Sequence, residues 1–139
     1  MNEVSPPSTW RIFVGWVGAL LVRLIVPGWI LFGAVSKVQG ASPKSLPRSI
    51  LDAGETIGFT DHFLLLSVLT SIEFFFIAMM LFIPKLARKS AITILSIFLL
   101  VLCVEIYNGA VSCGCLGKHS LDPKTMFAID FALLLGIVL

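Results

Sequence analysis

Long apolar stretches, separated by short polar segments, dominate the sequence. A helix needs roughly 20 mostly apolar residues to cross the hydrocarbon core of a bilayer. Three of the stretches are close to that length, and a shorter fourth follows near residue 139. The sequence therefore predicts an all-α fold, an integral membrane bundle of four transmembrane helices that forms one domain over residues 1–139. The predicted spans are 12–36, 62–83, 91–109 and 125–139.

The composition also favours a lipid environment. Hydrophobic residues make up 58% of the chain and charged residues 13%, whereas soluble domains are close to half apolar. A soluble chain of this size would expose large apolar patches, which promote aggregation. The net charge is only +2, and no basic run is long enough to follow nucleic-acid phosphates. We therefore expect a lipid bilayer, and no nucleic acid, as a partner.

The first apolar stretch has two alternative interpretations. The segment Ala34-Val35-Ser36 loosely resembles a signal-peptide cleavage site, but the apolar region of a signal peptide is about 7–15 residues long. The greater length here favours an uncleaved helix. In the polar connector that follows, Pro47 and Gly54 flank a segment that predicts a short interfacial helix over 46–54.

The basic residues predict an orientation. Lys85, Arg88 and Lys89 are concentrated in the predicted turn between the second and third spans, and Lys and Arg in short loops tend to stay in the cytoplasm. This orientation places both termini in the cytoplasm and the connection after the third span outside it. The cations on the predicted outer side are more scattered: Lys37, Lys44, Arg48, Lys118 and Lys124.

Two cysteines, Cys113 and Cys115, lie in that outer connection with Gly114 between them. Residues two apart approach the upper end of the Cα separation that a disulfide tolerates, roughly 4.4–6.8 Å, and glycine supplies the backbone freedom for closure. A strained, exposed disulfide is more oxidising than a structural one, so the pair predicts thiol–disulfide exchange. A nearby Lys118 or His119 would favour the reactive thiolate.

Metal binding is the alternative for the same connection. Two thiolates with His119, and with His62 at the same predicted surface, suit zinc or copper(I), although the spacing is not typical and we assign no metal ligand. A third interpretation gives the two thiols no chemistry. Cys103 lies within the third span, where a thiol behaves as a small apolar side chain.

Four charged residues fall inside the predicted spans: Arg23, Glu73, Glu105 and Asp130. A charge at mid-bilayer costs at least about 2.5–3.5 kcal/mol on insertion scales, so each needs a partner or a function. Counting from the span ends places Arg23 and Glu73 at similar depth, which favours an ion pair between the first two helices. Glu105 and Asp130 lie nearer the cysteines, and both helix pairing and proton handling stay open for them.

The order of these residues resembles a known family. Arg23-Leu24 followed by residues 31–37, Leu-Phe-Gly-Ala-Val-Ser-Lys, resembles the first-helix pattern of the DoxX-like membrane proteins, and Glu73 matches their helix-two glutamate. The segment 113–117, Cys-Gly-Cys-Leu-Gly, is similar to the Cys-Gly-Cys-Phe-Gly motif of the MauE (methylamine utilisation) branch. Asp130 lies where that branch often carries an acid. Leu116 replaces the usual aromatic residue, and the fourth apolar stretch is short.

The resemblance implies a multi-pass protein of the bacterial inner membrane. MauE is associated with maturation of the disulfide-rich light subunit of methylamine dehydrogenase, which implies a thiol–disulfide oxidoreductase with a disulfide-containing client and a periplasmic thioredoxin-like partner. DoxX relatives, which are linked to quinone-coupled sulfur oxidation, imply a quinone as electron acceptor. If electrons continue to a quinone, we expect Glu73, with Glu105 or Asp130, to manage protons. The residues leave open a second function, a non-enzymatic membrane subunit that binds a metal ion or anchors a partner through the Cys-Gly-Cys loop.

Overall fold

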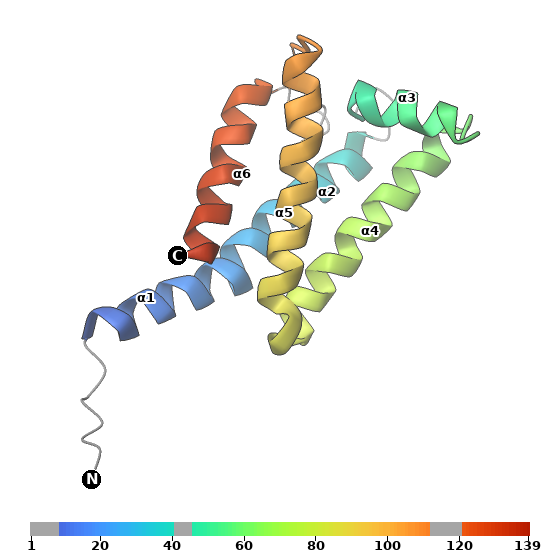
Figure 1. The fold of residues 1–139 in the computed structure, drawn as a ribbon. Helices are drawn as coiled ribbons and strands as arrows, with labels where there is room; N and C mark the ends of the chain where they lie inside the picture. Colours follow the sequence, from blue (N-terminus) through green and yellow to red (C-terminus); the bar gives the residue numbers. More distant parts are fainter. Residues whose placement is uncertain (1–8, 41–45, 112–120) are drawn as a thin grey trace.

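A computed structural model describes residues 9–40, 46–111 and 121–139 of the chain (Figure 1). Within those ranges every regular element is a helix and there is no strand, so the predicted all-α fold is confirmed there. The elements are α1 (Thr9–Leu20), the π-helical segment η1 (Leu21–Ile25), α2 (Val26–Gly40), α3 (Arg48–Thr56), α4 (His62–Phe82), α5 (Pro84–Tyr107) and α6 (Pro123–Val138).

The first long helix is continuous from Thr9 to Gly40, with η1 in its middle. Pro27 explains the π-helical segment, because proline has no N–H for the carbonyl four residues earlier, that of Arg23, and its ring crowds that carbonyl. The backbone widens instead, and the Val26 N–H donates to the Leu21 carbonyl five residues earlier. The first part, α1, has no buried residue and extends away from the bundle (Figure 1).

Helices α4 and α5 form an antiparallel pair with only Ile83 between them. The Asp61 carboxylate caps α4 by accepting from the amides of Phe63 and Leu64 at 3.0 and 3.4 Å. Pro84 occupies the first turn of α5, where a missing N–H costs nothing. The predicted basic turn over 85–89 is therefore wrong, since these residues already belong to α5.

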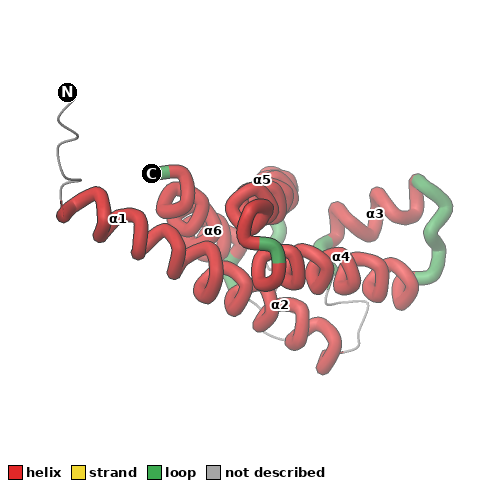
Figure 2. Tube along the Cα trace, turned by 90° about the horizontal axis from the view of Figure 1, so that it is seen from below, coloured by secondary structure: helices red, strands yellow, loops and turns green. Residues whose placement is uncertain are grey.

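The apolar core lies where η1, α2, α4, α5 and α6 meet (Figure 2). The short helix α3 packs against α4 and α5 and lies across the end of the bundle (Figure 1). It begins two residues after the predicted helix, with Pro47 at its N-cap. Gly54 permits close packing there, since a Cβ at this position would lie 2.8 Å from Leu65 Cδ2. The fully or nearly buried core side chains include Val26, Ile30, Met80, Ala91, Ile94 and Leu95.

Three helices in the described part of the chain are long and apolar enough to cross a membrane: Thr9–Gly40, His62–Phe82 and Pro84–Tyr107. The first and third are longer than predicted. The predicted fourth span corresponds to α6, which is helical but has only 16 residues. At about 1.5 Å of rise per residue, it falls short of a hydrocarbon core of about 30 Å.

The burial pattern is the reverse of that in a water-soluble domain. The apolar side chains of Trp16 and Leu100 are 76% and 68% exposed, whereas the acidic Glu105 and Asp130 are each 1% exposed. In water, this pattern would leave apolar area hydrated and would also bury charged groups. In a bilayer, apolar side chains on the surface contact lipid hydrocarbon, and ionisable groups point into the bundle interior. The surface is thus compatible with a membrane protein.

Candidate functional site

Four polar side chains converge in the interior where α2, α4 and α6 meet, and we refer to them as the charged cluster: Trp29, Lys37, Glu73 and Asp130. The three ionisable members are buried, with exposed fractions of 6% for Lys37, 5% for Glu73 and 1% for Asp130. All four line one cavity of about 20 Å³ together with Phe98 and Met126. The cavity is therefore small and is lined by both apolar and ionisable side chains.

Helix α2 contributes two members of the cluster from one face. Trp29, Gly33 and Lys37 are four residues apart in succession and all line the cavity, as expected for positions that share a helix face. Glu73 comes from the middle of α4 and Asp130 from the middle of α6. Three segments far apart in the sequence thus supply the cluster.

Lys37 and Glu73 form a buried ion pair. The ammonium Nζ of Lys37 donates to Oε1 of Glu73, and the same ammonium lies 5.8 Å from the centre of the Phe98 ring, within the range of a cation–π contact. The second carboxylate oxygen, Glu73 Oε2, is buried and has no hydrogen-bond partner among the described residues. The Glu73 carboxylate is therefore only half satisfied.

Asp130 receives one hydrogen bond from across the cavity. The indole Nε1–H of Trp29 donates to Asp130 Oδ1 at 3.0 Å. A buried indole N–H normally has such a partner, so the bond fixes the Trp29 ring and orients the carboxyl group of Asp130. Asp130 and Glu73 line the same cavity, so two acids and one base enclose it.

Glu105 lies apart from the charged cluster and contacts α3. Its Oε1 accepts from both the backbone N–H and the side-chain Oγ of Ser49, at 2.9 and 2.5 Å. Ser49 is in the first turn of α3, where backbone N–H groups lack intrahelical partners and negative charge is favourable. Glu105 thus caps α3 and fastens it to α5, which is a structural reason for its burial.

The predicted Arg23–Glu73 pair is wrong, because Glu73 pairs with Lys37. Arg23 is exposed and lines a groove with Arg88 and Gly136. Counting residues from the span ends predicts the depth of a charge only for an upright helix of ordinary length. The first helix is instead 32 residues long, and α4 packs mainly against its second half, α2, which brings Lys37 rather than Arg23 to Glu73.

Cys113, Cys115, Lys118 and His119 lie outside the described residues, so the redox pair stays a prediction. The structure does describe the helix ends on either side. The amides of Gly109 and Ala110 donate to the carbonyls of Ile106 and Glu105, at 3.1 and 3.0 Å, and Gly109 has a φ of +70°. This is the Schellman arrangement that ends a helix, and it terminates α5 just before the cysteine-bearing segment.

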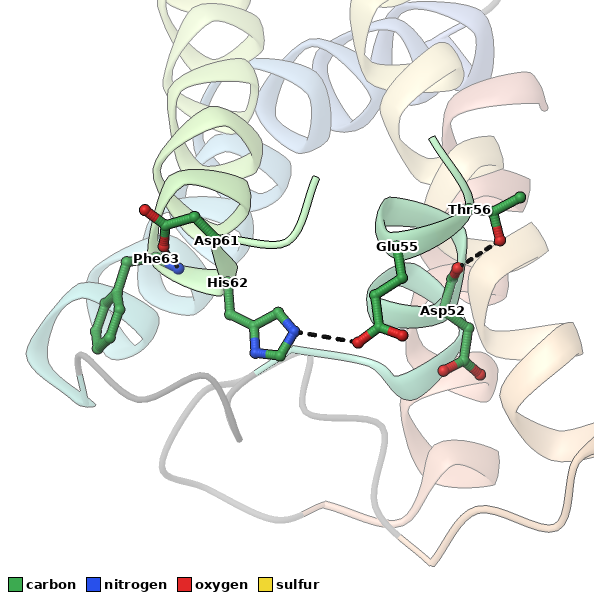
Figure 3. Close-up of polar contacts among 6 residues, drawn as sticks. All are labelled: Asp52, Glu55, Thr56, Asp61, His62 and Phe63. Carbon is green, nitrogen blue, oxygen red and sulfur yellow. Dashed lines mark hydrogen bonds and ion pairs between the residues drawn. The ribbon is translucent and has the colours of Figure 1, made fainter. Parts of the chain in front are cut away.

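His62 is the first residue of α4, and the metal alternative included it as a candidate ligand. Its Nε2 lies 3.4 Å from Oε1 of Glu55 in α3 (Figure 3). Both side chains are partly or largely exposed. The described residues contain no group of three or more His, Cys, Asp and Glu that could hold a metal ion. Because His119 and the cysteine pair fall outside them, the metal alternative stays untested. Cys103 is exposed on α5.

Sequence reasoning missed three residues that the structure brings into these contacts: Trp29, Lys37 and Ser49. The predicted spans place Lys37 one residue beyond the first helix, among the cations of the outer side. This placement is wrong, because Lys37 belongs to α2, where it is buried and paired with Glu73. A usable signal existed, because Trp29, Gly33 and Lys37 repeat at the four-residue spacing of one helix face. No comparable signal pairs Ser49 with Glu105, which are 56 residues apart.

Compared with known protein-family models, curated proteins and solved structures, the chain has no significant match to any of them. The resemblance to MauE and the DoxX-like proteins therefore stays a prediction. The function has to be argued from the residues and contacts of this chain.

Proposed function

We propose that the chain is a thiol–disulfide redox protein of the bacterial inner membrane, in which Cys113 and Cys115 cycle between dithiol and disulfide. The proposal rests chiefly on one observation. The segment that carries the cysteines connects the C-terminal end of α5 to the N-terminal end of α6, at the end of α5 opposite to Lys85, Arg88 and Lys89. Basic residues concentrated at one end mark the cytoplasmic side, so the cysteine segment faces the oxidising compartment.

The proposed membrane arrangement has four helices, of the DoxX-like kind. The three long apolar helices cross the bilayer, and α6 packs against α5 as the fourth. Its carboxyl group at Asp130 faces the interior of the bundle, as ionisable groups in membrane helices do. Helix α3 then lies beside the C-terminal end of α5, the end from which the chain continues into the cysteine segment, and beside α4 (Figure 1).

The proposed reaction is a balanced exchange of two electrons. A thiolate of the client attacks the Cys113–Cys115 disulfide and forms a mixed disulfide. The second client thiolate then closes the client disulfide and leaves Cys113 and Cys115 reduced. Oxidation of the Cys113–Cys115 dithiol back to the disulfide releases two electrons and two protons, which a membrane quinone would accept. A thioredoxin-like protein on the same side is the proposed partner, because it exchanges thiols by the same route.

Thiol labelling of the full chain tests this proposal. A membrane-impermeant maleimide added to intact spheroplasts is expected to label Cys113 and Cys115 only after reduction, with a Cys103→Ser background to remove the third thiol. Cys113→Ser and Cys115→Ser are each expected to abolish disulfide formation in the client. Labelling only after membrane disruption, or full client oxidation in both variants, would contradict the proposal.

The second candidate is a non-enzymatic subunit that holds a metal ion or a partner through the same segment. Two thiolates and the imidazole of His119 favour this function. It predicts that labelling of the cysteine pair depends on a chelator rather than on a reductant. A client whose disulfides form normally without the cysteine pair would also support it.

A further inference from the structure

The cavity of the charged cluster contains an unmet hydrogen-bonding group. The Glu73 residue is only 5% exposed, and its Oε2 has no hydrogen-bond partner among the described residues. A buried carboxylate oxygen without a donor is strongly unfavourable, because it has lost its hydrogen bonds to water and gained none in return. Glu73 also lines the cavity, so a small donor placed there would remove that cost.

The size and lining of the cavity fit a single water molecule. A cavity of about 20 Å³ exceeds the roughly 10–15 Å³ of probe-occupied volume that one water requires. A buried water also needs two to four polar partners. Glu73 Oε2 offers an acceptor, the Lys37 ammonium has donors beyond the one used by Glu73, and the Asp130 carboxyl group offers further acceptors.

The charges around the cavity do not balance. With their ordinary charges, Glu73 and Asp130 contribute two negative charges and Lys37 one positive charge. The fourth helix at the cavity, α5, contributes Phe98, which is uncharged. No other charged side chain of the described residues lines the cavity. An unpaired charge inside a bundle is strongly unfavourable, so the site requires one more unit of positive charge.

We propose that this cavity is a proton-binding site within the helix bundle, which holds one water molecule hydrogen-bonded to Glu73 Oε2 and one exchangeable proton shared by Glu73 and Asp130. The proton comes from bulk water and neutralises the excess negative charge. Lys37 limits the site to a single proton, because its ammonium already balances one of the two acids. This site goes beyond the proposed cysteine chemistry and does not depend on it.

Infrared spectroscopy of the purified full chain in lipid nanodiscs tests the proposal, because protonated and ionised carboxyl groups absorb differently. At neutral pH and without sodium, we expect a protonated-carboxyl signal of one group per chain that shifts in deuterated water. Both Glu73→Gln and Asp130→Asn should lose it completely, since either change leaves one acid and one base. Glu105→Gln is the matched control, and it should leave this signal unchanged.

Lys37→Met gives the opposite expectation. Removing the base leaves two acids to neutralise, so the signal should double from one to two protonated carboxyl groups per chain. A signal that survives in both Glu73→Gln and Asp130→Asn would overturn the proposal. So would a signal that disappears when sodium ions are added at constant pH, because the cavity would then bind a metal cation instead of a proton.

The two proposals fail separately. Cys113→Ser and Cys115→Ser should leave the infrared signal unchanged, because the proposed proton is shared by Glu73 and Asp130 and requires neither cysteine. The loss of client oxidation in those variants, with an intact signal, supports both proposals. The infrared result can therefore overturn the proton site without bearing on the cysteine pair.

Discussion

Glu73 and Glu105 are buried to nearly the same extent, yet their surroundings differ. Glu105 accepts a backbone amide and a hydroxyl from Ser49 and thereby caps α3. Glu73 pairs with a lysine, but one of its oxygens has no partner, and a second acid shares its cavity. The contacts of Glu105 account for its burial. The contacts of Glu73 leave its Oε2 without a donor and leave one of the two acids at the cavity without a balancing positive charge.

The difference shows why burial alone does not identify a functional acid. A carboxylate at a helix N-terminus is stabilised by the fold itself. A carboxylate with an unmet oxygen and an excess of like charge needs something beyond the protein, here a water and a proton. The comparison predicts that changes near Glu73 disturb charge balance, whereas changes near Glu105 disturb only the placement of α3.

The largest expected effect belongs to Lys37→Met. Breaking a buried ion pair by removing one partner costs about 3–5 kcal/mol, because the Glu73 carboxylate loses the ammonium that balances it and has to take up a proton instead. The free energy of unfolding, measured by SDS titration in mixed micelles, should fall by that amount. The double variant Lys37→Met/Glu73→Gln should be more stable than Lys37→Met alone. If the second change brought no recovery, charge balance would not govern this cluster.

The next effect, on the other side of the comparison, is that of Glu105→Ala. The half-buried Ser49 amide loses its acceptor, and a donor left unsatisfied costs about 1–3 kcal/mol. Hydrogen exchange of the Ser49 amide should accelerate while amides in the middle of α4 keep their protection. Glu105→Gln is the control, because its carbonyl oxygen can still accept from Ser49. Equal acceleration throughout the bundle would mean that Glu105 does more than fasten α3.

A smaller effect is expected for Trp29→Phe. The substitution keeps an aromatic ring but removes the Nε1–H that donates to Asp130, a loss of about 1 kcal/mol of stability. The matched control is Trp16→Phe, because Trp16 is 76% exposed and should change stability less. The same SDS titration compares the two variants. An equal loss in both would show that the bond to Asp130 contributes nothing to the cluster.

The sequence predicts much of this fold because apolar length alone indicates the long helices. It also identifies Glu73, Glu105 and Asp130 as interior charges, and the structure buries all three. It does not predict their partners, because these depend on helix tilt and on where helices cross. Pro84 similarly suggests a stop, although a proline equally suits the first turn of the next helix, which is how α5 begins.

The smallest expected effect, that of Arg23→Leu, separates the predicted pairing from the observed one. If Arg23 were the partner of Glu73, its loss would cost several kcal/mol, as for any broken buried pair. Arg23 is exposed and lines a groove together with Arg88. We therefore expect the free energy of unfolding to change by no more than about 0.5 kcal/mol. Lys37→Met, measured beside it in the same titration, supplies the contrast. A loss at Arg23 as large as that at Lys37 would mean that depth along the chain, and not the crossing of α2 with α4, selects the partner of Glu73.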